Sequence, residues 1–364
     1  IDEMSEFWTA FPALKKALFT ESGIPYVNVS TPDIKSAIKS HPDVVGFEDA
    51  FNAAFSTFPA FLKEELIDRM ESIEISKAET VLSADIFERL KEIPLIDKYA
   101  AFQLLDDDWT GISIDLEVLQ TEGFSATKEV DPNLVIKKKD GKDQEVQEGW
   151  VGHIIPFDLV QATLLSTETD ELHGLESRLA EIPSEYESIL DEMTEEDKES
   201  CNDVLTEEGD AFVPKEVSKK IKDLKKDRSP ESVALRTLLE KVESLVKSEK
   251  EIKAEIKAKS AALQAKTKDT IESLSDEQAL DLLEKKWIAP LIESIHKLPD
   301  TVIDSLVSKI QALQNKYATT FFEVEQQISE TEATLSGMID DLEGNEYDML
   351  GLNELKKLLG GSAE

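Results

Sequence analysis

Three consecutive carboxylates, Asp106 to Asp108, are the residues of this sequence that most resemble a metal site. Carboxylate oxygens suit a divalent cation, but a cation needs ligands that converge on it from several directions. These three aspartates fall in the C-terminal part of an expected helix, where neighbouring side chains diverge and the helix dipole disfavours acids. We therefore interpret them as solvated surface and predict no metal site.

The histidines and the common catalytic motifs give no stronger signal. The four histidines, His41, His153, His173 and His296, include no two at the spacing of a metal-ligand pair. We interpret His41, which precedes Pro42, as a cap or turn residue, and His153, between apolar residues, as a structural histidine. The sequence contains no Gly-x-Ser-x-Gly elbow, Gly-x-Gly-x-x-Gly loop or Walker lysine loop. We predict no catalytic, cofactor-binding or metal-binding residue in this chain.

Four lysines form the only basic cluster in the first half of the chain. They flank an Asp-Gly dipeptide that is typical of a tight turn between two strands. The cluster could contact a DNA backbone, because lysine is a common phosphate ligand. Lysines also protect exposed strand edges from unwanted pairing, and both interpretations stay open. The four residues are Lys137, Lys138, Lys139 and Lys142.

Charge and composition narrow the class of protein. The 364 residues include 40 basic and 77 acidic ones, a net charge of -37, which repels a phosphate backbone overall. This argues against general nucleic-acid binding by the isolated chain. The single cysteine, Cys201, excludes a disulfide framework and suits the cytoplasm. No apolar run approaches the roughly 20 residues of a membrane helix. The chain starts at Ile1 without a signal-type segment, so we expect part of a longer cytoplasmic protein.

The elements that would position these side chains are mainly helical. We predict a mainly α fold, in which a helical domain carries a small β-hairpin insertion and is followed by long coiled-coil-like helices. The predicted segments are a helical domain over residues 1–111, a hairpin and linker over 112–160, and a long-helix assembly region over 161–364. In the first segment, an aromatic stripe at helical spacing indicates core rather than a ligand pocket. Its members are Val44, Phe47, Phe51, Phe55 and Phe58.

The third segment contains two stretches of opposite charge. Residues 168–210 hold 17 acidic and 2 basic residues, and residues 215–266 hold 15 basic and 9 acidic ones. This inversion predicts an antiparallel helical hairpin whose register is fixed by charge, although a basic arm could instead reach DNA. The apolar seam of the second arm runs from Leu235 to Leu263. We expect Met193 to Asp210, between the arms, to form an exposed, partly mobile tip.

The stretch from Trp287 to Leu342 carries one long apolar helix face. Apolar residues recur at steps of three and four from Val302 onward, which predicts a helix of roughly 40 residues. A helix of that length needs a partner of similar length. We predict a partner interface on it, with burial against the Leu235 to Leu263 seam as the alternative. The interface residues are Leu306, Ile310, Leu313, Tyr317, Phe321, Val324, Ile328 and Leu335.

Several blocks of the chain resemble one protein family. The block from Glu92 to Tyr99, which contains Pro-Leu-Ile-Asp-Lys-Tyr, is similar to a block of the modification subunits of type I restriction-modification systems. Ser5 to Lys15 resembles the region that follows their methyltransferase domain. Lys286 to Ala289 and Lys316 to Thr320 are similar to their C-terminal helices. The resemblance spans nearly the whole chain.

The resemblance implies a function in assembly. The parent subunit would be an adenine-specific DNA methyltransferase that uses S-adenosylmethionine, but the family's cofactor loop and Asn-Pro-Pro-Phe motif do not occur here. No catalytic residue is therefore carried over, and no cofactor is expected in this chain. The implied partners are the specificity subunit, through its helical spacers, the restriction subunit, and DNA through the assembled complex. A stand-alone acidic coiled-coil scaffold or chaperone is the alternative.

Overall fold

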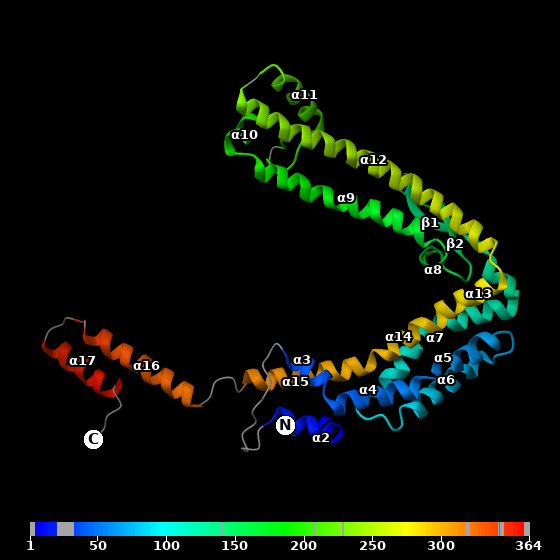
Figure 1. The fold of residues 1–364 in the computed structure, drawn as a ribbon, viewed down its shortest axis with the longest axis horizontal. Coiled ribbons are helices and arrows are strands. Elements are labelled where there is room, and N and C mark those ends of the chain that lie inside the picture. The colour runs from blue at the N-terminus through cyan, green and yellow to red at the C-terminus, as the bar shows by residue number, and fades with distance from the viewer. Residues whose placement is uncertain are drawn as a thin grey trace. The chain divides into compact units, whose positions relative to one another are not determined.

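The computed structural model describes residues 4–19, 33–139, 142–206, 208–227, 229–316, 321–340, 342 and 346–359. In these ranges the chain is mainly helical, with one antiparallel pair of strands (Figure 1), and the predicted fold class is confirmed. None of the described helices is long and apolar enough to cross a membrane.

The chain divides into two compact units, each assembled from separate stretches of sequence. The first unit comprises Ile1–Pro59, Thr80–Asp107 and Ile292–Glu364, and the second comprises Ala60–Glu79 and Asp108–Leu291. The sequence pattern had suggested consecutive segments. The helices before the strands are α1 (Ser5–Ala10), α2 (Pro12–Leu18), α3 (Ile34–Lys39), α4 (Pro42–Phe55), α5 (Phe58–Leu62), the π-helix η3 (Lys63–Asp68), α6 (Ile75–Arg89), α7 (Lys98–Glu122) and the 3-10 helix η4 (Phe124–Lys128).

The strands are followed by helices to the end of the described chain. The strands are β1 (Val130–Lys139) and β2 (Lys142–Gly152). The later helices are α8 (Phe157–Thr163), α9 (Ser166–Glu192), α10 (Glu195–Ser200), α11 (Pro214–Leu224), α12 (Pro230–Glu272), α13 (Asp276–Leu283), the π-helix η5 (Glu284–Ile288), α14 (Ala289–His296), α15 (Leu298–Lys316), α16 (Phe321–Asp340) and α17 (Glu346–Leu359).

The aromatic stripe of α4 lies in the core of the first unit, as predicted. Val44, Phe47, Phe51, Phe55 and Phe58 are all buried, and the rings of Phe51 and Phe55 stack with centroids 4.7 Å apart. His41 caps α4, because its Nδ1 accepts a hydrogen bond of 3.2 Å from the backbone N–H of Asp43. This confirms its interpretation as a cap residue.

Helix α15 packs along α3 in the same unit. Lys35 pairs with Asp304 at 2.6 Å and Lys39 pairs with Asp300 at 2.5 Å, so the two helices run antiparallel. The apolar face of α15 buries Ile303, Leu306 and Ile310 completely. These side chains belong to the core of the chain itself.

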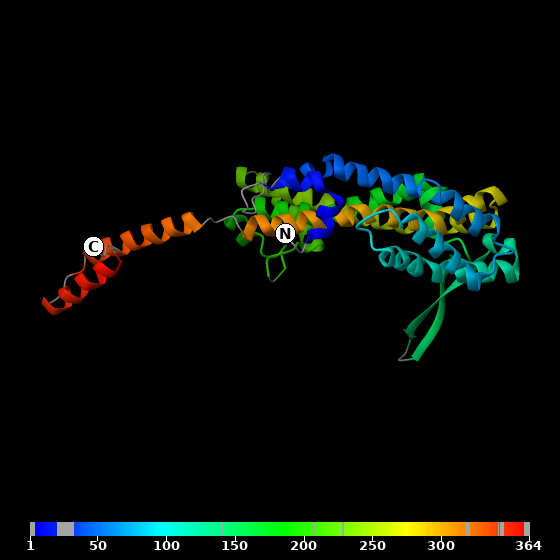
Figure 2. The same cartoon turned by 90° about the horizontal axis from the view of Figure 1, so that it is seen from below.

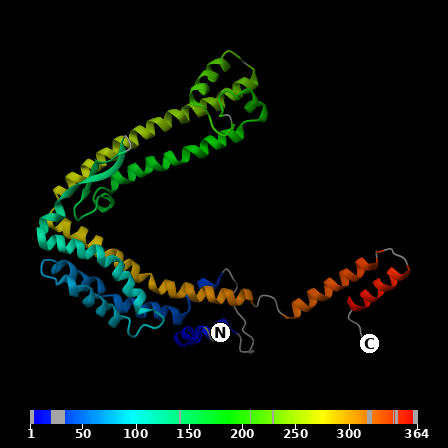
Figure 3. The same cartoon turned by 180° about the vertical axis from the view of Figure 1, so that it is seen from behind.

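In the second unit, α9 and α12 form the antiparallel hairpin that the charge inversion predicted. Figures 1 and 3 show the two helices side by side. Glu192 pairs with Lys241 at 3.1 Å near one end, Glu171 pairs with Lys259 at 2.7 Å, and Glu168 pairs with Lys266 at the other end. Partners thus rise along α12 as they fall along α9. We call this pair of helices the arm; α12, with 43 residues, is its longer helix.

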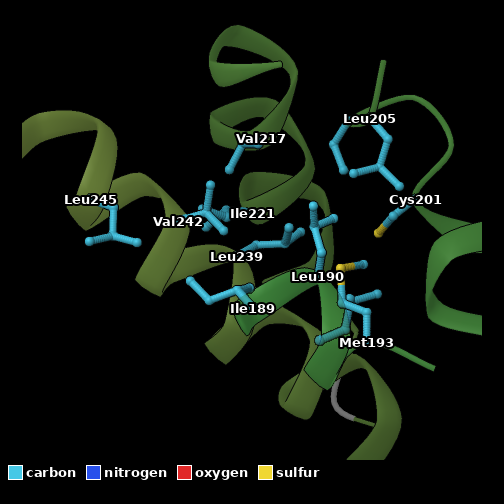
Figure 4. Packing of buried hydrophobic residues seen from close by; sticks show 12 residues of the cluster. Ile189, Leu190, Met193, Cys201, Leu205, Val217, Ile221, Leu239, Val242 and Leu245 are labelled. Carbon is cyan, nitrogen blue, oxygen red and sulfur yellow. The ribbon is translucent and has the colours of Figure 1, made fainter. Parts of the chain in front are cut away.

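The end of the arm is a packed head, and the predicted exposed tip is wrong. The head comprises α10, α11 and the facing ends of α9 and α12, joined by a bridge between Leu205 and Phe212. Its buried side chains pack together in Figure 4. Cys201 and Val204 are fully buried, although Met193 to Asp210 shows no helical apolar period. The cluster is Ile189, Leu190, Met193, Cys201, Val204, Leu205, Val217, Ile221, Leu235, Leu239, Val242 and Leu245.

The predicted hairpin is present as β1 and β2, which extend as a ribbon away from the neighbouring helices of their unit (Figure 2). Val135 faces Val146 and Lys138 faces Asp143 across the ladder, and the register shifts between Pro132 and Leu134. The expected turn at 140–141 lies outside the described residues. Since most side chains of the two strands are exposed, the helices of the unit cover little of the hairpin.

Candidate assembly interface and polar junction

The predicted partner interface divides into a buried half and an exposed half. Leu306 and Ile310 on α15 are fully buried, and Leu313 is half-buried. They pack within the first unit, where α15 contacts α3, and the Leu235 to Leu263 seam of α12 packs on α9 instead. Leu306 and Ile310 therefore belong to the core of this chain.

The exposed half lies on α16. Val324 is 41% exposed, Ile328 53% and Leu335 43%. Met338 and Leu342 continue the same line and are 61% and 51% exposed. An apolar side chain contributes to stability only to the extent that it leaves water, so this row contributes little to the fold of the isolated chain.

Two further residues of the predicted interface fall at the edge of the described structure. Tyr317 lies outside the described residues, and Phe321 is the first residue of α16. The predicted helix of roughly 40 residues is described as α15, with 19 residues, and α16, with 20 residues. Helix α17 folds back beside α16 (Figure 1), where Ser336 and Ile339 are half-buried. The exposed row is on a different side of α16.

The lysine cluster lies on the projecting hairpin among acidic residues. Lys137 forms an ion pair with Glu148, and Lys138 lies opposite Asp143. Lys139 and Lys142 face each other at the end of the described ladder. Because β2 also carries Asp143, Glu145 and Glu148, acids on the same two strands offset much of this positive charge. A backbone contact with DNA stays a prediction.

A polar junction that the sequence did not suggest lies at the base of the hairpin. The side chain of Asp115, on α7, is buried, and its Oδ2 accepts hydrogen bonds from Lys286 Nζ at 2.5 Å and Trp287 Nε1 at 2.7 Å. Lys286 Nζ also donates to the carbonyl oxygen of Ile154 at 2.6 Å. The junction thus joins α7, η5 and the segment after β2. A buried charge is tolerated because it is paired and hydrogen-bonded.

His153 completes the base of the hairpin. Its Nδ1 lies 2.7 Å from Asp131 Oδ2, and its Nε2 lies 3.1 Å from Glu122 Oε2. The hydrogen bond to Asp131 is the main cause that raises the pKa of His153 above its ordinary value, and partial burial opposes it. Two carboxylates can both accept only from the doubly protonated ring. His153 therefore has the structural function that its apolar neighbours in sequence indicated.

Position Gly152 fixes how the chain leaves the hairpin. A Cβ atom there would lie 1.7 Å from the carbonyl oxygen of Ile155, far inside any tolerated contact. Any other residue would push the segment that carries His153 and the Ile154 carbonyl out of place. The polar junction therefore depends on this glycine.

Across the described ranges, no group of three or more His, Cys, Asp or Glu side chains is arranged to hold a metal ion. Asp106 and Asp107 both accept hydrogen bonds from Gln103 on the surface of α7. A hollow of about 730 Å³ lies between the hairpin and α12, where Lys268 lies 4.9 Å from the centre of the Trp150 ring.

Asp115 could have been found from its neighbours in sequence. Ile112, Leu116 and Leu119 occupy one helical face and are buried, and Asp115 lies on the same face. An acid on an apolar face is a signal for a buried partner. The partner, Lys286, lies 171 residues further along the chain. No pattern near either residue in the sequence indicates that they pair.

Comparison of the chain with protein families, with curated proteins and with solved structures finds no match.

Proposed function

We propose that this chain is an assembly module that docks a partner protein through the exposed apolar row of α16. The observation that carries the proposal is the contrast within one predicted interface. Leu306 and Ile310 are buried inside the chain, whereas Ile328 and Leu335 remain open to water. A contiguous row of exposed apolar side chains costs solubility, and such rows are typical of protein–protein contacts.

The resemblance in sequence supports a more specific proposal. The chain would be the C-terminal region of a type I modification subunit, and its partner would be the helical spacers of the specificity subunit. S-adenosylmethionine would bind the methyltransferase part of the parent subunit, and a restriction subunit and DNA would join through the assembled complex. The four lysines at the end of the hairpin would be a minor backbone contact in that complex. The motifs behind this proposal are the block from Glu92 to Tyr99 and the Lys286 to Ala289 block.

Co-purification of the full chain with a specificity subunit tests the proposal. We expect a complex with the unaltered chain and loss of the complex when Ile328 and Leu335 are both replaced by Ser. The matched control replaces Val81 and Val233 by Ser. These two apolar side chains lie on other helices and are exposed to a similar extent, at 46% and 39%. The complex should survive the control. An unchanged complex with the α16 variant would show that docking uses another surface.

An assay of methyl transfer to unmodified DNA tests independently whether this chain has methyltransferase activity by itself. We expect no turnover by this chain alone, because the adenine-methyltransferase motifs that the family uses are missing from its sequence. Turnover that resists removal of trace contaminants would contradict the proposal.

A further inference from the structure

The exposed row of α16 has the spacing of a coiled-coil seam. Its positions alternate in steps of three and four, the a and d positions of a heptad repeat. The members are Phe321, Val324, Ile328, Thr331, Leu335, Met338 and Leu342. Six of these side chains are exposed in the described chain: Val324, Ile328, Thr331, Leu335, Met338 and Leu342. The seam is therefore built for another helix that lies along it, rather than for a single inserted side chain.

The charge beside the seam has one sign only. Residues 321–340 contain five acids and no Lys or Arg. In this register Glu332 occupies an e position on one side, and Glu330 occupies the c position on the other, beyond Gln327. Flanking charges of a coiled coil determine which partner and orientation are allowed. A partner flanked by acids would be repelled, and one flanked by lysine or arginine would be attracted.

The surface over the second half of the seam is open. A shallow hollow of about 520 Å³ is lined by Gln327, Glu330, Thr331, Thr334, Leu335 and Met338. Glu330 therefore lines the same hollow as Leu335 and Met338. An apolar side chain of a partner could enter the hollow while a cation on its next turn pairs with Glu330.

The chain's own basic helices do not have a free face for this seam. The apolar residues of α11, Val217 and Ile221, are buried in the head of the arm, and those of α12 pack on α9. A second copy is disfavoured as well, because pairing two α16 helices would bring their acids together. Burial thus rules out the chain's own basic helices, and charge disfavours a second copy.

We propose that α16 binds a basic amphipathic helix of a partner protein, with an apolar a/d seam flanked by lysine or arginine and a length of about 30 Å, the length of the 20-residue α16 itself. This inference deepens the proposed function, on which it rests, by naming the chemistry of the partner helix. Long-range attraction between the acidic face and the basic helix also speeds association at low ionic strength.

Two synthetic helices of about three heptads, matched to the length of α16, test the inference directly with the full chain. Both have Leu at d and Ile at a; one has Lys at every e and g position and the other has Glu. We expect the lysine helix to bind at least about tenfold more tightly than the glutamate helix, and added salt to reduce this preference. Equal binding of both helices, or stronger binding of the glutamate helix, would overturn the inference.

Charge-swapped variants locate the binding. Glu330→Lys/Glu332→Lys should weaken binding of the lysine helix about tenfold and strengthen binding of the glutamate helix. Glu332 is half-buried, so Glu330→Lys alone is measured too and should give a smaller change of the same sign. The control, Glu117→Lys/Glu176→Lys, adds the same charge at exposed acids of other helices. If the control weakens binding as much as the α16 variant, only the net charge matters and the inference is wrong.

Failure of this inference and failure of the proposed function give different results. If a specificity subunit binds the chain but ignores the Glu330 and Glu332 swap, the basic-helix inference fails and the proposed function stands. If the lysine helix binds α16 and no specificity subunit does, the inference stands and the proposed function fails. Sedimentation of the free chain should show a monomer. A dimer that Leu335→Asp dissociates would show that the occupant is a second copy.

Discussion

The head of the arm and helix α16 carry apolar faces of comparable extent, but only the face in the head is buried. Leu239 and Val242 on α12 are fully shielded from water, whereas Ile328 and Met338 on α16 are more than half exposed. Both faces follow the steps of three and four that predict an amphipathic helix. The periodicity of a helix therefore shows that it has a face to cover, and not what covers it.

Charge and connection explain the difference between the two regions. The arm's helices carry opposite charge and are joined through the head, so α9 is held close to α12 and in register by pairs such as Glu171–Lys259. Exposed pairs of this kind add little stability, but they disfavour other registers. Among the described helices, the one that packs along α16 is α17, and it covers a different side. Its acid-flanked seam is left without a covalently linked partner of opposite charge.

The largest effect should come from the buried side of this comparison. Replacing Leu239 by Ala removes a fully buried side chain from the head and should lower its free energy of unfolding by about 3 kcal/mol. Native-state hydrogen exchange of amides in α10, α11 and α12 would measure the change locally. Val233→Ala, at an exposed site on the same helix, is the control and should cost less than about 0.5 kcal/mol. Equal protection in both variants would mean that the head is not a packed core.

The polar junction should give the next largest effect. Asp115→Ala leaves the Lys286 ammonium without its carboxylate and should destabilise the second unit by about 2 kcal/mol. Asp115→Asn keeps an acceptor for Trp287 Nε1 and should cost about half as much. Denaturant unfolding followed by tryptophan fluorescence measures both. The junction would be dispensable if Ala and Asn at this position both matched the unaltered protein.

The sequence predicted well wherever a local pattern determines structure. The aromatic stripe, the His41 cap of α4 and the hairpin of β1 and β2 all follow from spacing and turn chemistry. It failed for the head, because Cys201 and Val204 are buried by contacts with distant helices and not by helical period. In the candidate interface, it did not separate Leu306 from Ile328, since both lie on the same kind of face.

We expect a smaller effect from His153, which should make the stability of the hairpin depend on pH. Its folded-state pKa is raised, so its contribution to stability is complete below the ordinary pKa of about 6.5 and is lost as pH rises through the folded-state pKa. Exchange of amides in β1 and β2 should therefore speed up across that window beyond the intrinsic pH dependence. His153→Gln should abolish this extra dependence. If the variant keeps the same pH profile, another group is responsible.

The smallest effect on folding is expected for the exposed row of α16. It gives the most direct comparison between this row and the buried face in the head. Leu335→Ala removes the same number of carbon atoms as Leu239→Ala, but Leu335 is 43% exposed and has little burial to lose. Its cost in unfolding free energy should be below about 0.5 kcal/mol, while binding of the lysine helix should fall at least about fivefold. Leu239→Ala should thus lower the free energy of unfolding, and Leu335→Ala should instead weaken binding, because the first side chain stabilises the fold and the second stabilises a complex. A large loss of stability with Leu335→Ala would mean that the chain itself covers this seam, and α16 would then belong with the head.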